Sequence, residues 1–179
     1  LVKFFLPALA FLALIGVVDS TLLANDLANG YGRQVKDIGQ VHCPDVVEGA
    51  VRLVDLPVVY ERQGWGGMRT VDQAGQSSPA AGGRRWCDGF IGHAPSLIEF
   101  KIEPGRYRFL ELQVAKDDLQ PTGDGVQFCV EANREEIWCS GLIRHLSREK
   151  AKIEIPSSAD RLTLKVDQLG NSHDDHIVW

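Results

Sequence analysis

The chain has 179 residues, of which 44% are hydrophobic, and a formal net charge of −5. This size and composition suit one globular domain with a short extension. Acidic and basic residues are interspersed, and a pair such as Arg84-Arg85 is too short to mark a nucleic-acid-binding surface, so we expect no nucleic-acid partner. The sequence lacks GxSxG, HExxH and P-loop motifs, and therefore predicts no enzyme.

The N-terminal residues have the layout of a secretory signal peptide. Lys3 precedes an apolar run, Phe4–Val18, that is short for a membrane span, and small or polar residues follow it. We expect residues 1–24 to be a signal peptide, with an uncleaved N-terminal anchor as the alternative, and residues 25–48 to be a linker. Both alternatives predict a secreted, periplasmic or cell-surface domain, without a transmembrane domain once a signal is cleaved.

From residue 49 to residue 179 the sequence predicts short β-strands separated by turns. Apolar and polar residues alternate with a period of two in Ser96–Ile102, Tyr107–Ala115, Ala151–Ile155 and Leu162–Val166. Ser140–Lys150 is the one helix candidate. Many short strands at roughly even spacing predict an all-β sandwich or barrel.

The chain has four cysteines and no CxxC motif, which disfavours a zinc or thioredoxin-like site. An exported chain would permit two disulfides, while four free thiols are the alternative. Cys129 and Cys139 flank a hairpin. A two-residue turn at Asn133-Arg134 would pair Cys129 with Trp138, and a three-residue turn would set the cysteines opposite each other. The other two cysteines are Cys43 and Cys87.

A series of short motifs then carries a family resemblance. In order they are Leu53–Leu56, Gly64–Gly66, Gly89–Ser96 (GFIGHAPS), Tyr107–Phe109, Asp117-Asp118, Val126–Val130, Trp138–Gly141, Leu162–Val166 and Asp175–Trp179. In this order the chain resembles the NPCBM/NEW2 domain, a carbohydrate-binding module found beside family 98 glycoside hydrolases, and is similar to carbohydrate-binding module family 51. The resemblance covers about Val51 to Trp179.

The resemblance implies a galactose-binding-domain-like jelly-roll β-sandwich of two antiparallel sheets. It also implies non-catalytic binding of a carbohydrate partner, with a galactose-type glycan as one candidate, through loops at one end of the sandwich. The alternative is a structural or protein-interaction sandwich without a sugar site. Family members usually continue beyond the position of Trp179, so we expect a short or missing last strand and an exposed sheet edge.

An exposed aromatic ring can stack on the flat C–H face of a sugar, with polar groups at its rim. Trp65, in a glycine-flanked loop, is the best candidate for such a ring, whereas Trp138 and Trp179 are better explained as core residues. The predicted sugar contacts are Trp65, Arg69, Trp86, His93, Asp117, Asp118, Asn171 and His173.

GFIGHAPS and the final residues are predicted to fasten the fold, through Gly89, Gly92, His93, Pro95, His176 and Trp179. His93 therefore has two interpretations, a sugar contact and a structural hydrogen bond. Zinc is disfavoured because His173 and His176 would point to opposite faces of a strand. No cofactor is required, but calcium suits the loop carboxylates, with Asp174 and Asp175 as the candidate ligands.

Overall fold

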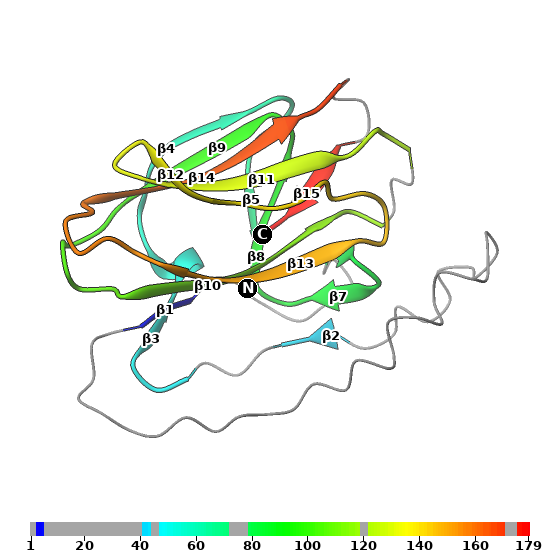
Figure 1. Cartoon of the computed structure of the whole chain (residues 1–179). Coiled ribbons are helices and arrows are strands. Elements are labelled where there is room, and N and C mark those ends of the chain that lie inside the picture. The colour runs from blue at the N-terminus through cyan, green and yellow to red at the C-terminus, as the bar shows by residue number, and fades with distance from the viewer. Residues whose placement is uncertain (1–2, 6–40, 44–46, 72–78, 119–121, 171–174) are drawn as a thin grey trace.

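The computed structural model describes residues 3–5, 41–43, 47–71, 79–118, 122–170 and 175–179. These residues form a β-sandwich, with β4, β9, β14, β11 and β12 in one layer and β1, β10, β13 and β8 in the other (Figure 1). The predicted fold class is confirmed. The expected signal peptide and linker fall largely outside the described residues, as do Asn171, His173 and Asp174.

Within the described residues the larger sheet has seven strands in the order β3-β1-β10-β15-β8-β5, with β13 paired to the opposite edge of β10. Its strands are β1 (Lys3–Phe5), β3 (Ala50–Arg52), β5 (Arg69–Val71), β8 (Gly89–His93), β10 (Phe109–Lys116), β13 (Arg148–Glu154) and β15 (His176–Val178). The 3₁₀ helix η3 (Leu53–Asp55) follows β3.

The facing sheet has five strands in the order β12-β11-β14-β9-β4. They are β4 (Val58–Gln63), β9 (Ser96–Lys101), β11 (Val126–Ala132), β12 (Glu135–Cys139) and β14 (Arg161–Gln168). A small third sheet contains β2 (Val41–His42), β6 (Ala80–Ala81) and β7 (Arg84–Trp86). Ala81 and Trp86 of the small sheet pack on Ala115 and Val178, and so cover part of the outer face of the larger sheet.

The period-two pattern accounts for the core between the two sheets. Alternate side chains of a strand point to opposite faces, so each strand contributes every second residue to the interior. The main cluster includes Ile98 and Phe100 of β9, Leu110, Leu112 and Val114 of β10, Phe128 and Val130 of β11, and Leu162, Leu164 and Val166 of β14, all fully buried or nearly so. Phe90 of β8, Ile177 of β15 and Trp179 at the C-terminus belong to the same buried cluster.

The final strand is short, as expected, but it does not leave an exposed edge. β15 pairs with β8 on one side and with the end of β10 on the other, so it lies inside the larger sheet. Trp179 follows it and is fully buried, with its ring edge-on to Phe128 at 4.8 Å between ring centroids. The backbone of Trp179 exchanges two hydrogen bonds with Phe90, of 3.0 and 3.3 Å.

Gly89, which begins β8, is required where the chain passes Trp179. Its φ of +141° is unfavourable for residues with a side chain, and a Cβ atom there would lie 2.1 Å from the carbonyl oxygen of Trp179. Only glycine lets the two backbones approach this closely. This geometry supports the predicted fastening between GFIGHAPS and the final residues.

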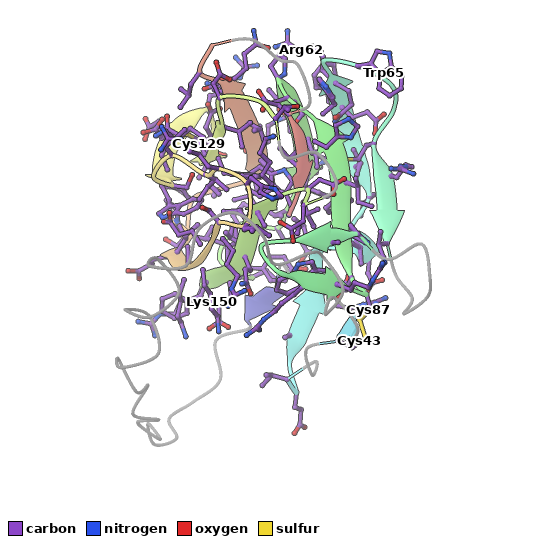
Figure 2. All side chains as sticks on the ribbon, turned by 90° about the vertical axis from the view of Figure 1, so that its right-hand side faces the viewer. Cys43, Arg62, Trp65, Cys87, Cys129 and Lys150 are labelled. Carbon is purple, nitrogen blue, oxygen red and sulfur yellow. A yellow bond between two sulfur atoms is a disulfide. The ribbon has the colours of Figure 1, made fainter. Side chains whose placement is uncertain are left out.

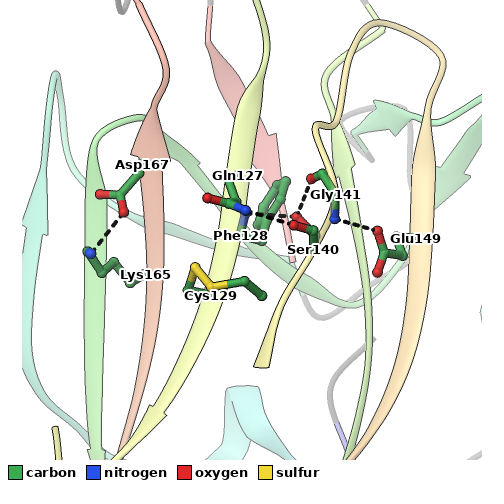
Figure 3. Close-up of a disulfide and its surroundings, with 9 residues drawn as sticks. Gln127, Phe128, Cys129, Ser140, Gly141, Glu149, Lys165 and Asp167 are labelled. Carbon is green, nitrogen blue, oxygen red and sulfur yellow. Dashed lines mark hydrogen bonds and ion pairs between the residues drawn. A yellow bond between two sulfur atoms is a disulfide. The ribbon is translucent and has the colours of Figure 1, made fainter. Parts of the chain in front are cut away.

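The Cys129–Cys139 disulfide joins β11 and β12 with the two cysteines opposite each other, which is the register expected from a three-residue turn, although the turn itself has two residues. Asn133 and Arg134 both have positive φ, as in a two-residue type I′ turn. A register shift between Val130 and Glu131 then adds one residue on β12, and Cys129 faces Cys139 (Figure 3). The second disulfide joins Cys43 and Cys87, so none of the four cysteines is a free thiol.

The helix expected at Ser140–Lys150 is wrong, because this segment makes a turn at His145-Leu146 and then enters β13. Ser140 explains the difference locally. Its hydroxyl accepts a hydrogen bond from the backbone N–H of Phe128 at 3.0 Å and donates one to the carbonyl of Gly141 at 2.7 Å. Glu149 accepts a further hydrogen bond from the N–H of Gly141 at 3.0 Å (Figure 3). These side chains bind backbone groups that a helix would use.

Gly89→Ala tests the close approach to Trp179. We expect a loss of at least about 2 kcal/mol in the free energy of unfolding, because the methyl group overlaps a backbone atom that cannot move alone. Urea denaturation measures the loss. Gly67→Ala is the matched control, since a Cβ atom at Gly67 meets no atom within 4 Å. Equal stability of the two variants would contradict the assignment.

Removal of the hairpin disulfide by the double substitution Cys129→Ala and Cys139→Ala should lower the free energy of unfolding by about 2–3 kcal/mol. The reason is that the bond closes a short loop, with a sequence separation of 10, in the unfolded chain. Denaturation of the oxidised wild-type domain and of the variant measures the difference. An unchanged midpoint would show that the bond adds nothing to the hairpin.

Candidate functional site

Strand register places three polar side chains in one row on the outer face of the larger sheet. His176 of β15 lies directly opposite His93 of β8, and their rings meet edge to face at 5.0 Å between centroids. The N–H of Asp117, just after β10, donates to the carbonyl of His176 at 2.9 Å. Ala115 pairs with Val178, so their side chains lie on the same face of the sheet. Asp117 is two residues after Ala115 and His176 is two residues before Val178, so both lie on that face as well.

Trp65 extends this row at the end of the sandwich. Its side chain is 73% exposed, and its ring lies edge-on to His93 at 6.3 Å between centroids. Figure 2 shows Trp65 projecting from the loop between β4 and β5, near Arg62. We refer to Trp65, His93, His176 and Asp117 together as the Trp65 ledge.

The loop that carries Trp65 is fixed to the turn after β8. Gln63 accepts a hydrogen bond from the N–H of His93 at 3.0 Å, and the N–H of Gly64 donates to the carbonyl of His93 at 3.3 Å. Glycine is needed at position 64, because a Cβ atom would lie 2.5 Å from the carbonyl oxygen of Ala94. These contacts hold the loop against a rigid strand end.

The hydrogen bond of His93 defines which ring nitrogen faces a ligand. Nδ1 lies 2.7 Å from the carbonyl oxygen of Ala94. A carbonyl can only accept, so Nδ1 carries the proton and Nε2 of the neutral ring is an acceptor. The structural role and the sugar-contact role predicted for His93 are therefore compatible. Nδ1 holds the turn through Ala94, and Nε2 can accept a hydrogen bond from a hydroxyl group.

Arg69 lies beside the ledge on the same face. It pairs with Ile91 across β5 and β8, and Ile91 is two residues from His93, so the two side chains project in the same direction. Arg69 is exposed. The structure thus brings together four predicted sugar contacts, namely Trp65, Arg69, His93 and Asp117, with His176.

Trp86 and Asp118 are placed differently from the sequence prediction. Trp86 is 3% exposed and its indole N–H donates to the carbonyl of Ala81 at 2.9 Å, so its ring offers no face to a sugar. Asp118 is also buried and accepts hydrogen bonds from the N–H groups of Gly82 at 3.0 Å and Gly83 at 2.7 Å. Both side chains hold the small sheet in place, and we correct their assignment to a structural role.

Burial raises the pKa of the Asp118 carboxyl, while the hydrogen bonds from Gly83 and Gly82 act in the opposite direction. The Asp118 carboxylate is thus engaged by the N–H groups of the Gly82-Gly83 turn. Asp117, its neighbour in sequence, faces the ledge instead. Adjacent side chains of an extended chain point to opposite faces, so Asp117 lies at the ledge while Asp118 binds the backbone of the small sheet.

A buried ion pair lies beneath the ledge. Lys116 and Asp175 are both fully buried, with 3.6 Å between the Lys116 Nζ and Asp175 Oδ1 atoms. The ammonium group of Lys116 also donates to the carbonyl of Thr122. The carbonyl of Asp175 accepts from the N–H of Ala94 at 2.9 Å, which ties the start of β15 to the turn after β8. Burial raises the pKa of Asp175, and the charge of Lys116 opposes this.

These contacts do not fit calcium at Asp175. A calcium ion needs six to eight oxygen ligands, but the Asp175 carboxylate already faces the ammonium group of Lys116. Among the described residues the one cluster of candidate metal ligands is Cys129, Glu136 and Cys139. Its two cysteines form a disulfide and have no thiolate to offer.

The sequence predicts only a structural role for His176 and no role for Gln63, whereas both lie at the ledge. Gln63 lies thirty residues before His93, and no local pattern announces its contact with that residue. Gln63 is brought to His93 because it pairs with Ser96 across β4 and β9. This pairing cannot be predicted from a single sequence.

Lys116→Met should lower the free energy of unfolding by about 3–5 kcal/mol, because it leaves the Asp175 carboxylate buried without its counter-charge. The folded pKa of Asp175 lies above the unfolded value of about 3.9. The cost is therefore absent when the carboxyl is protonated and grows as the pH rises through the folded pKa. Urea denaturation from pH 3.5 to pH 7.5 measures this difference between variant and wild type.

The double variant Lys116→Met and Asp175→Leu is the matched control. It removes both charges, so most of the lost stability should return. A single variant as stable as the wild type at neutral pH would contradict the role of the ion pair.

Comparisons with known proteins place the family and the fold of the chain. The sequence matches the NPCBM/NEW2 domain over residues 49–179. No curated protein matches the chain. The residues of GFIGHAPS and the final strand, which fasten the ledge, lie inside the matched range.

Solved structures share the fold. The CBM51-2 and INT domains of ZmpB from Clostridium perfringens, determined alone and with GlcNAc, superpose with a TM-score of 0.62 at 20% identity. That match covers 72% of this chain and 30% or 29% of the other, so this chain spans less than a third of those structures. The CBM51 from C. perfringens GH95, in complex with methyl-galactose, has a TM-score of 0.61 at 23% identity, with 72% and 94% covered.

Proposed function

The chain belongs to the NPCBM/NEW2 domain family, and from this premise we propose that it binds a glycan at the Trp65 ledge. The domain itself is a non-catalytic, CBM51-like carbohydrate-binding module. The observation that carries the proposal is the exposed ring of Trp65 beside the imidazole of His93, with 6.3 Å between the ring centroids. The predicted contacts Asn171 and His173 remain part of the proposal, although they lie outside the described residues.

The chemistry of the ledge suits a neutral pyranose, and a galactose-type sugar is our first candidate. A pyranose can lay its C–H face on the Trp65 ring, with its hydroxyl groups toward His93 Nε2, the Asp117 carboxylate and the Arg69 guanidinium. Related structures contain GlcNAc and methyl-galactose, which supports a single sugar unit as the ligand. Hydrogen bonds join Gln63 and Gly64 to His93 and hold the Trp65 loop in place, so little ordering is needed on binding.

An extracellular location supports the same proposal. The disulfides Cys43–Cys87 and Cys129–Cys139 indicate an oxidising compartment. The proposed signal peptide at residues 1–24 would direct the domain there. Within the described residues no helix has the length and apolar character of a membrane span.

Trp65→Ala should weaken glycan binding about tenfold or more, which corresponds to about 1.4 kcal/mol. The ring is 73% exposed, so its removal should change the free energy of unfolding by less than about 0.5 kcal/mol. A glycan array on the purified domain identifies ligands, and titration calorimetry with methyl-galactose and GlcNAc compares wild type and variant.

Tyr60→Ala is the matched control, because Tyr60 is another exposed aromatic residue, at 52%, on β4. It should leave sugar affinity unchanged. The proposal fails if no glycan binds above background, or if both variants bind as the wild type does.

A protein partner is the second candidate, favoured by one specific observation. Val58, Val59 and Tyr60 are exposed by 40 to 52% on β4, the edge strand of the smaller sandwich sheet. Such an edge can accept an added strand. Binding of a partner that Tyr60→Ala weakens and Trp65→Ala does not would select this alternative.

A further inference from the structure

The outward-facing side chains of β13 form a line of cations away from the Trp65 ledge. Arg148, Lys150 and Lys152 are exposed, and they alternate with residues that are at least half-buried. Neighbouring members of the line are about 7 Å apart, because a strand rises about 3.4 Å per residue. Figure 2 shows Lys150 at the opposite end of the domain from Trp65.

Arg84 of β7 joins this line from a distant part of the sequence. Arg84 pairs with Ala81 across the turn that holds Gly82, the residue whose carbonyl binds Arg148. Burial lowers the pKa of Arg148, the positive charge of Arg84 lowers it further, and the Asp118 carboxylate acts in the opposite direction. Arg148 is nevertheless held in place, since its Nη1 donates to the carbonyl of Gly82 at 2.5 Å. An anion bound beside both groups would relieve the repulsion between the two positive charges.

Arg108 extends the line at its other end. The guanidinium carbon of Arg108 lies 5.0 Å from the centre of the Phe109 ring, and the Nζ atom of Lys152 lies 4.9 Å from the same centre. Phe109 thus holds two cations close together by cation–π contacts. We call Arg84, Arg108, Arg148, Lys150 and Lys152 the basic face.

Carboxylates on this surface only partly balance the charge. Glu111 pairs with Lys152 at 3.0 Å, and Glu154 is exposed at the end of β13. Among the described residues Lys150 and Arg84 have no carboxylate within ion-pair distance. The buried Asp118 carboxylate also acts on Arg148. Five cations against three carboxylates give a local charge of about +2, on a chain whose net charge is −5.

The small sheet separates the basic face from the Trp65 ledge. Arg148 lies opposite Ala115, and Ala115 lies opposite Val178. Ala81 and Trp86 pack over Ala115 and Val178. The small sheet therefore lies between the ledge and Arg148, and the two surfaces are distinct.

We propose that the basic face binds an anionic polysaccharide, whose carboxylate or sulfate groups are repeated along a linear chain. This surface goes beyond the proposed sugar site. A nucleic acid fits less well, because single strands need exposed aromatic rings for base stacking, and the ring of Phe109 already faces two cations. Protection of a sheet edge would explain charges on β13, but not the recruitment of Arg84 from another sheet.

The test measures binding of the purified domain to immobilised dextran sulfate, polygalacturonate and neutral dextran at 50, 150 and 300 mM salt. We expect binding to one or both polyanions, a steep loss of affinity with salt, and none to neutral dextran. Binding to dextran sulfate alone, or to polygalacturonate alone, identifies the preferred anionic group. The double variant Arg84→Glu and Lys150→Glu should weaken binding about tenfold and reduce the salt dependence.

Lys101→Glu with Arg134→Glu is the matched control, since both residues are exposed and the change in net charge is the same. Lys150→Glu alone, a substitution at one exposed position, keeps the test valid if the double variant unfolds. Trp65→Ala should retain polyanion binding, so failure of the proposed sugar site and failure of this inference are distinguishable. The inference is overturned by no polyanion binding at 50 mM salt, by equal losses in the control, or by equally tight binding of single-stranded DNA.

Discussion

The close backbone contact between Trp179 and Gly89 is the constraint on which the rest of the structure depends. The two backbones are so close that no side chain fits at Gly89, and Phe90 and Trp179 exchange hydrogen bonds across the contact. The Trp179 ring fills the core against Phe128. This contact fixes β15 between β8 and β10, and therefore also fixes which residues of the three strands face outward together.

The candidate site follows from that register. With β15 in place, His176 must lie beside His93, and Asp117 must follow on the same face. On the inner face the same strands bring Lys116 against Asp175, and this pair anchors the strand ends. The loop that carries Trp65 is held beside His93 by Gln63, whose side chain accepts a hydrogen bond from the backbone N–H of His93. The ledge is thus built on paired strands and the end of β10, and Trp65 joins it from the loop between β4 and β5.

Much of the fold could be predicted from local patterns, because alternation in strands such as β10 and β14 directly reflects one buried face. The exposed Trp65 was also predictable, from the glycines that flank it. The burial of Trp86 was not, since the small sheet that covers it depends on packing between distant segments. The hairpin register depended on a bulge that no turn motif signals. Asp175 resembled a metal ligand because Lys116, its partner, is 59 residues away in the sequence.

Sugar binding at the Trp65 ledge is tested most directly by an NMR titration of the four indole N–H groups of the ¹⁵N-labelled domain with methyl-galactose and with GlcNAc. We expect a saturable shift of the Trp65 signal with at least one of these sugars, while the signals of the buried Trp86 and Trp179 stay unchanged. A sugar that shifts another indole signal and leaves Trp65 unmoved would contradict the assignment of the ledge as the binding site.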